Sequence, residues 1–141
     1  MKTLLLTIAL SFLVATTQGK AAGSIQTNGI YGEKKLATIL DYEVLKASSA
    51  WKMGEGEPPI GPGKAVGLAS TALKTQFSNF KDAVVREVSL VSSKNGCYYR
   101  VVISQDIDME AVAAAGGKMK PNQMTFYVLL NSTVIHPKDK D

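Results

Sequence analysis

The sequence contains few side chains spaced as catalytic or metal-binding residues are. His136 is the only histidine in the sequence. A Ser–His–acid triad or a two-histidine metal site needs an imidazole that is held in place. Because His136 precedes Pro137 close to the end of the sequence, we interpret it as a surface residue beside a polar tail. We therefore expect no catalytic residues and predict that the chain is not an enzyme.

A second candidate is an acidic triplet, Asp106, Asp108 and Glu110, whose carboxylates alternate along the chain. Carboxylate oxygens are ligands that Ca²⁺ prefers, but the glycine and the distant glutamate of a calcium loop are missing. A cation site and a solvated acidic loop remain open alternatives for this triplet. No Cys or His spacing indicates zinc, so we expect neither a metal site nor a cofactor.

The composition is that of an ordinary globular protein with a small net positive charge. The 141 residues are 45% apolar and 20% charged, with a formal net charge of +4. This length fits one domain. The lysines are scattered and form no basic stripe interleaved with aromatic residues, so we expect no nucleic-acid partner.

The first residues are typical of a secretory signal peptide. Lys2 precedes an apolar run at 3–15, and small residues follow as far as Ala22. The run is shorter than the ~20 apolar residues that span a bilayer. We predict a leader at 1–19, with cleavage after Gly19 or as late as Ala22, and an exported protein, periplasmic or secreted, without a membrane span.

Cys97 is the only cysteine. A single thiol cannot form an internal disulfide, so the core must supply the stability of the domain. The sequence leaves two possibilities for Cys97: a small buried apolar side chain, or a thiol that pairs between chains.

The rest of the sequence divides into three parts. Residues 20–35 are polar with little periodicity, and we expect them to be loosely ordered. Residues 36–136 form the predicted domain, and 137–141 a polar tail. At the start of the domain the alternation of Leu40, Tyr42 and Val44 favours a strand, with a helix over 36–46 as the competing prediction.

A helix beginning at Pro62 is the strongest prediction. Gaps of three and four place six apolar residues on one stripe: Ala65, Val66, Ala69, Ala72, Leu73 and Phe77. Pro62 suits a first helical turn, where its missing N–H would lack a partner in any case. We expect this stripe to face a sheet.

Beyond residue 80 the apolar period changes to two, which predicts strands at 84–93, 97–105 and 123–135. Asn95-Gly96 indicates a type I′ hairpin turn. That turn would pair Ser92 with Tyr99, Leu90 with Val101, and Val88 with Ile103. With the connection at 106–122, the order predicts an α+β fold in which one helix packs across a curved antiparallel sheet of three to four strands.

The face of this sheet away from the helix is the predicted binding face. Its polar and aromatic residues are Tyr98, Arg100, Tyr127 and Asn131. A cavity there would favour a small-ligand carrier or a hydrolase, and a flat surface would favour a protein partner.

Several motifs resemble the PepSY domain: Pro62-x-x-Ala65-x-x-x-Ala69 at the helix start, Val88-x-Leu90 before the glycine turn and Tyr99-x-Val101 after it, and the last strand from Phe126. The outline is also similar to the cystatin fold, although its Gln-x-Val-x-Gly loop is absent. The resemblance implies an exported module that binds partners or restrains peptidases and has no enzymatic activity. We thus expect a binding module for a protein or peptide, with a peptidase inhibitor, or a carrier or hydrolase using the polar face, as alternatives.

Overall fold

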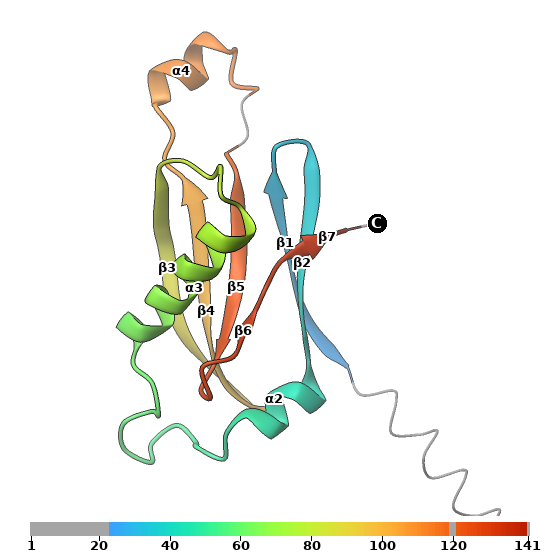
Figure 1. Ribbon diagram of the computed structural model, residues 1–141, viewed down its shortest axis with the longest axis vertical. Coiled ribbons are helices and arrows are strands. Elements are labelled where there is room, and N and C mark those ends of the chain that lie inside the picture. Colours follow the sequence, from blue (N-terminus) through green and yellow to red (C-terminus); the bar gives the residue numbers. More distant parts are fainter. Residues whose placement is uncertain (1–22, 119–120, 141) are drawn as a thin grey trace, which may run out of the picture.

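The computed structural model describes residues 23–118 and 121–140 (Figure 1). Its elements are β1 (Ser24–Tyr31), β2 (Lys34–Asp41), α2 (Tyr42–Ser48), α3 (Pro62–Gln76), β3 (Ala83–Ser93), β4 (Gly96–Gln105), α4 (Met109–Ala114), β5 (Gln123–Leu129), β6 (Val134–Ile135) and β7 (Lys138–Asp139). All pairings are antiparallel, in the order β3-β4-β5-β1-β2-β7, and β6 pairs with β5. The α+β class is confirmed. The prediction of three to four strands was wrong, because the described residues contain seven.

Helix α3 forms where the apolar stripe predicted it. Gly61 is extended and Pro62 opens the first turn. The helix ends at Gln76, and the N–H of Phe77 donates to the carbonyl of Leu73. Four residues of the stripe are buried against the sheet: Ala65, Ala69, Ala72 and Leu73.

The β3–β4 hairpin has the predicted faces in a different register. Leu90 lies opposite Tyr99 and Val88 opposite Val101, two residues away from the predicted partners. Ser93 pairs with Gly96, so the turn is Lys94-Asn95. Gly96, with φ 135°, is the only residue of the turn with positive φ, whereas a type I′ turn needs two such residues. A shift of two leaves each side chain on its predicted face.

The last predicted strand is broken. Strand β5 ends at Leu129, and the chain turns back through Ser132, whose φ is 72°. The side chain of Asn131 accepts a hydrogen bond from the N–H of Thr133 and stabilises this turn. Residues 134–135 then pair with β5 as β6. The continuous strand at 123–135 was therefore wrong.

The region expected to be loosely ordered contains a strand. β1 and β2 pair along their whole length, from Ser24–Asp41 to Tyr31–Lys34, across a two-residue turn with Gly32 at φ 61°. Strand β2 stops at Asp41, and Tyr42 and Val44 belong to α2. The strand predicted through Val44 is confirmed as far as Asp41 and was wrong beyond it, and the competing helix holds only for its second half.

The segment predicted as a polar tail belongs to the sheet. Pro137 is fully buried, and its carbonyl accepts a hydrogen bond from Nε2 of Gln76 at 2.6 Å. Residues 138–139 form β7 on the edge of β2. The sheet therefore extends on both sides of the predicted domain 36–136.

The outer edge of β5 is shared by two strands. β1 pairs with β5 at one position, Ile30 with Gln123, and β6 pairs at the other end of β5. Between them the hydroxyl of Thr38 donates to the carbonyl of Thr125 at 2.6 Å, in a buried contact. A Cβ on Gly29 would lie 2.7 Å from the carbonyl oxygen of Gln123, so glycine permits this close approach.

This arrangement creates two apolar clusters. The larger lies between α3 and the sheet and includes Leu73, Val101, Phe126 and Val128. The smaller lies on the other face, where the β1–β2 hairpin and α2 cover β4 and β5; it contains Leu40, Leu45, Tyr98, Tyr127 and Leu129. Strands β4 and β5 are therefore covered on both faces.

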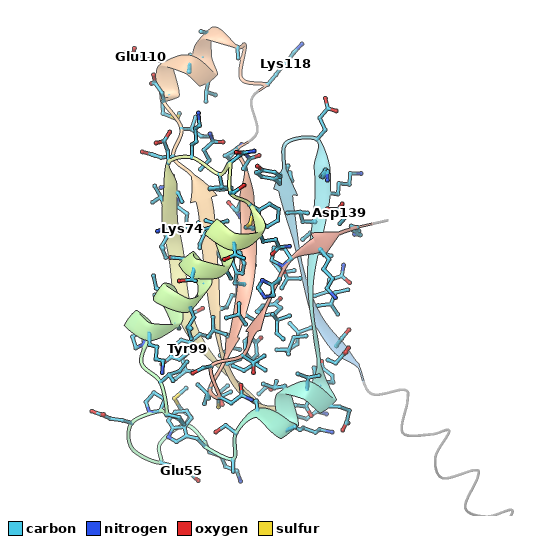
Figure 2. The ribbon with its side chains drawn as sticks, viewed as in Figure 1. Glu55, Lys74, Tyr99, Glu110, Lys118 and Asp139 are labelled. Carbon is cyan, nitrogen blue, oxygen red and sulfur yellow. The ribbon has the colours of Figure 1, made fainter. Side chains whose placement is uncertain are left out.

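We predict that Leu73→Ala strongly destabilises the domain, whereas Lys74→Ala does not. Leu73 is 3% exposed, while the neighbouring Lys74 lies on the exposed surface of α3 (Figure 2). Truncating a buried leucine typically costs ~2–5 kcal/mol, and a surface change away from special contacts costs no more than ~0.5 kcal/mol. Chemical denaturation of both variants measures the difference. Equal effects, or a larger cost at Lys74, would contradict the packing of α3.

Candidate functional site

The predicted binding face is largely filled by the protein itself. Tyr98 and Tyr127 are 5% and 0% exposed. Their rings meet edge to face, with centroids 5.3 Å apart. The hydroxyl of Tyr127 makes a short contact with Oγ1 of Thr27 on β1. These two tyrosines are part of the core beneath the β1–β2 hairpin.

The other two residues of that face do not complete a site. Arg100 pairs with Glu87 at 3.3 Å, both half-exposed. Asn131 lies beyond the end of β5 in an exposed turn. Four cavities open among the described residues at β2, β1, α2 and α3, and none of these four is lined by Tyr98, Arg100, Tyr127 or Asn131. The structure therefore does not bring the four residues together on an open face.

The acidic triplet is separated by its local contacts. Asp106 pairs with Arg86 at 3.5 Å, and the side chain of Asp108 accepts a hydrogen bond from the N–H of Glu110 at the start of α4. Within residues 23–118 and 121–140, no three His, Cys, Asp or Glu side chains gather where they could hold a metal ion. Cys97 is buried as a free thiol, one of its two possibilities.

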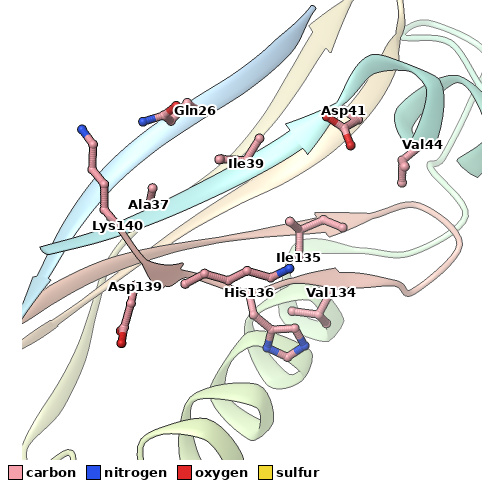
Figure 3. A pocket seen from close by; sticks show the side chains of 11 residues that line it. Gln26, Ala37, Ile39, Asp41, Val44, Val134, Ile135, His136, Asp139 and Lys140 are labelled. Atoms are coloured by element: carbon pink, nitrogen blue, oxygen red, sulfur yellow. The ribbon is translucent and has the colours of Figure 1, made fainter. Parts of the chain in front are cut away.

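A groove of about 670 Å³ runs beside β2, and none of the four residues of the predicted face lines it. Strands β2, β6 and β7 line it, with one residue each from β1 and α2 (Figure 3). Its lining residues, which we call the β2 groove, are Gln26, Ala37, Ile39, Asp41, Val44, Val134, Ile135, His136, Lys138, Asp139 and Lys140. This volume lies in the range of ligand and peptide sites.

Several solvent-exposed apolar side chains lie next to one another in the groove. Ile39 is 49% exposed and Val44 43% exposed. Val134 and Ile135, from the opposite side of the groove, are half-buried. Exposed apolar side chains that gather in a concave site indicate a binding surface more strongly than the same residues scattered singly.

One side of the groove is an unpaired backbone edge. The N–H of Lys140 donates to the carbonyl of Lys35, so the backbone groups of Lys35 point away from β1. The backbone N–H and C=O groups of successive residues point to opposite sides of an antiparallel strand. The groups of Ala37 and Ile39 therefore point the same way as those of Lys35, away from β1. Pairing with β7 stops at Ala37. The backbone groups of Ile39 therefore face the groove with no strand beside them.

The opposite side of the groove has the same character. The N–H of Leu129 donates to the carbonyl of Thr133, and Ile135 pairs with Tyr127. By the same alternation, the backbone groups of Val134 and His136 point away from β5. The groove thus lies between two strand edges that carry free donors and acceptors.

Charges differ between the two ends of the groove. Asp41 and Val44 lie at the α2 end, and Asp139 and Lys140 at the β7 end (Figure 3). Asp139 pairs with Lys34 at 3.5 Å. Among the described residues neither Lys138 nor Lys140 has an acidic partner, so the β7 end is positive.

Sequence reasoning missed this groove because its residues come from segments interpreted as a loose region, a strand and a tail. The one available signal was that Ile39 and Leu40, which are both apolar, point to opposite faces of the strand. A strand with apolar residues on both faces needs a packing partner on each face. His136 does line the groove, and its ring lies 6.3 Å from that of Phe126.

Comparisons with protein-family models, with curated proteins and with solved structures found no match to this chain. In the part of the chain that the structure describes, no helix is long and apolar enough to cross a membrane.

Burial raises the pKa of the Tyr98 hydroxyl above its usual value of 10, and the neighbouring Tyr127 adds to the effect. A tyrosine that is harder to ionise when folded stabilises the protein fully below pH ~10, and this contribution is lost as the pH rises above that value. We predict that the free energy of unfolding falls as the pH rises above about 10, and that it falls less in Tyr98→Phe. Urea denaturation across this range tests the prediction. Parallel curves for the two proteins would show that Tyr98 ionises as freely when folded as when unfolded.

Proposed function

We propose that this protein is an exported, non-enzymatic binding module that holds an extended segment of a protein or peptide in the β2 groove. The observation that carries this proposal is the free backbone edge at Ile39, which lies beside exposed apolar side chains. An extended peptide that adds to a sheet edge gains main-chain hydrogen bonds, and alternate side chains enter adjacent pockets.

The groove suits such a segment in shape and in polarity. Ile39, Val44 and Ile135 offer an apolar surface to an inward-facing side chain. The lysines of the β7 end favour an acidic residue at one end of the segment, and Asp41 favours a basic residue at the other. Charge complementarity of this kind sets the orientation of a bound peptide as well as its rate of association.

Export is the second part of the proposal. Its support is the leader pattern at 1–19, with Lys2, the apolar run and the small residues that follow. Cleavage there leaves Lys20, or at the latest Gly23, as the first residue of the mature chain, which N-terminal sequencing reads directly. Retention of Met1 in protein recovered outside the cytoplasm would contradict it.

The alternatives rank below the peptide-binding module. A peptidase inhibitor is supported by the resemblance to PepSY domains, which itself stays a proposal. A small-ligand carrier or hydrolase on the predicted polar face has less support, because Tyr98 and Tyr127 are buried there.

We predict that Ile39→Pro abolishes most peptide binding while the fold survives. Proline removes the N–H that faces the groove and leaves the β1 side of β2 untouched; edge strands tolerate it in this position. Peptides selected from a displayed random library on the wild-type protein provide the probes. Their affinity, measured by calorimetry, should fall at least about tenfold, since one hydrogen bond is worth about 0.5–1.5 kcal/mol and the ring also blocks the edge.

Ile39→Val is the matched control, because it keeps the N–H and most of the apolar surface. It should bind the same peptides within about threefold of wild type, and melting curves check that both variants fold. If no peptide is enriched, or if Ile39→Pro binds as well as Ile39→Val, the groove is not a strand-addition site.

A further inference from the structure

The opposite edge of the sheet is also open. β3 is the terminal strand, and its outer edge has no neighbour along Ala83–Ser93 among the described residues. Natural proteins protect such edges with lysines, prolines or bulges. β3 has one bulge, between Val85 and Glu87, and its only charges are Arg86 and Glu87. From Val88 onward the edge is regular and uncharged.

Helix α3 covers this strand incompletely. The helix crosses the sheet diagonally, and in the view of Figure 1 its first turn projects past β3 while its last turns lie over β5. The beginning of β3 is left uncovered: Val85 is 39% exposed and Val88 38% exposed. A cavity of about 220 Å³ opens there, with Leu73, Phe77 and Phe80 in its walls.

We propose that β3 is the interface with a second copy of this chain, paired antiparallel across a two-fold axis perpendicular to the sheet. Such an axis keeps both α3 helices on the same face of a continuous sheet. It also places the uncovered beginning of each β3 beside the end of its partner, where the first turn of the partner's helix projects. The projecting first turn of α3 in one copy thus covers the exposed beginning of β3 in the other.

The side chains of β3 fit this pairing. Hydrogen-bonded and non-hydrogen-bonded pairs alternate along an antiparallel ladder, so residues next to each other in sequence cannot face each other across the two copies. The two-fold axis must therefore pass between two copies of the same residue. Centred on Ser89, the ladder sets Val88 opposite Leu90 of the second copy, on the helix side. Glu87 then faces Val91, so no charge opposes a like charge in this ladder. No other edge of the sheet offers an uncharged regular stretch of this length among the described residues.

The test is the mass of the purified protein by sedimentation across a wide concentration range. We expect a reversible shift from monomer to dimer. Val88→Lys should weaken it at least about tenfold, because an ammonium would be buried without a partner. Val44→Lys introduces the same charge at a valine of similar exposure, 43%, which lies on α2 beside the β2 groove and not on β3, and should leave the dimer unchanged.

Ser89→Cys gives an independent reading of the register. Facing residues on the axis lie about 4.5–5.5 Å apart, within the range for a disulfide. Mild oxidation should therefore cross-link Ser89→Cys into a dimer, whereas the wild type, whose only cysteine is buried, should stay uncrosslinked. A monomer at all concentrations would overturn the proposal. So would a dimer that Val88→Lys leaves intact or that residue 89 does not cross-link.

Discussion

The architecture depends on how the outer edge of β5 is shared. One strand could have paired along its whole length, but β1 takes one end through Ile30 and Gln123, and β6 takes the other. The buried carbonyl of Thr125, left between them, is satisfied by the hydroxyl of Thr38. An unpaired buried carbonyl would cost about 1–3 kcal/mol of stability. The hydroxyl of Thr38 removes that cost and so allows two strands to share the edge of β5.

Both the core and the groove follow from that division. β1 and β2 leave the line of β5 and cover its second face, which buries Tyr98 and Tyr127. β6 stays with β5 and then crosses to β2 as β7. No ladder joins β2 to β6 among the described residues, because β2 pairs with β7 and β6 pairs with β5, and the groove lies between their facing edges. The site that we propose for a partner is a consequence of the strand order, built from backbone groups as much as from side chains.

Local patterns in the sequence predicted the helix and the β3–β4 hairpin well. The three–four spacing from Ala65 to Phe77 places α3 and its buried face, and the alternation around Val88 and Val101 places each side chain on the correct face. The turn was wrong by one residue and the register by two, because Asn95-Gly96 suits several turn types and the type is decided by which residues adopt positive φ.

Long-range placement could not be predicted in the same way. Little in the local sequence marks β1 as a strand, since its exposed residues are polar and Thr27 and Gly29 stand between Ile25 and Tyr31 on its inward side. The hairpin pattern shows that β4 has a second face without showing what covers it, so Tyr98 and Arg100 were interpreted as accessible. The one local sign of the β1–β5 junction is Gly29, and its role becomes evident only with Gln123 beside it.

The most direct test of the open edge is the exchange rate of the Ile39 amide, measured by NMR without any partner. Thr38 and Leu40 follow the opposite alternation, so their N–H groups bond to β1 and should be strongly protected. Ile39 should exchange much faster than both, as a donor that faces the groove. If the Ile39 amide is as slow as those of Thr38 and Leu40, the edge is already occupied within the protein, and the account of the groove as a strand-addition site is contradicted.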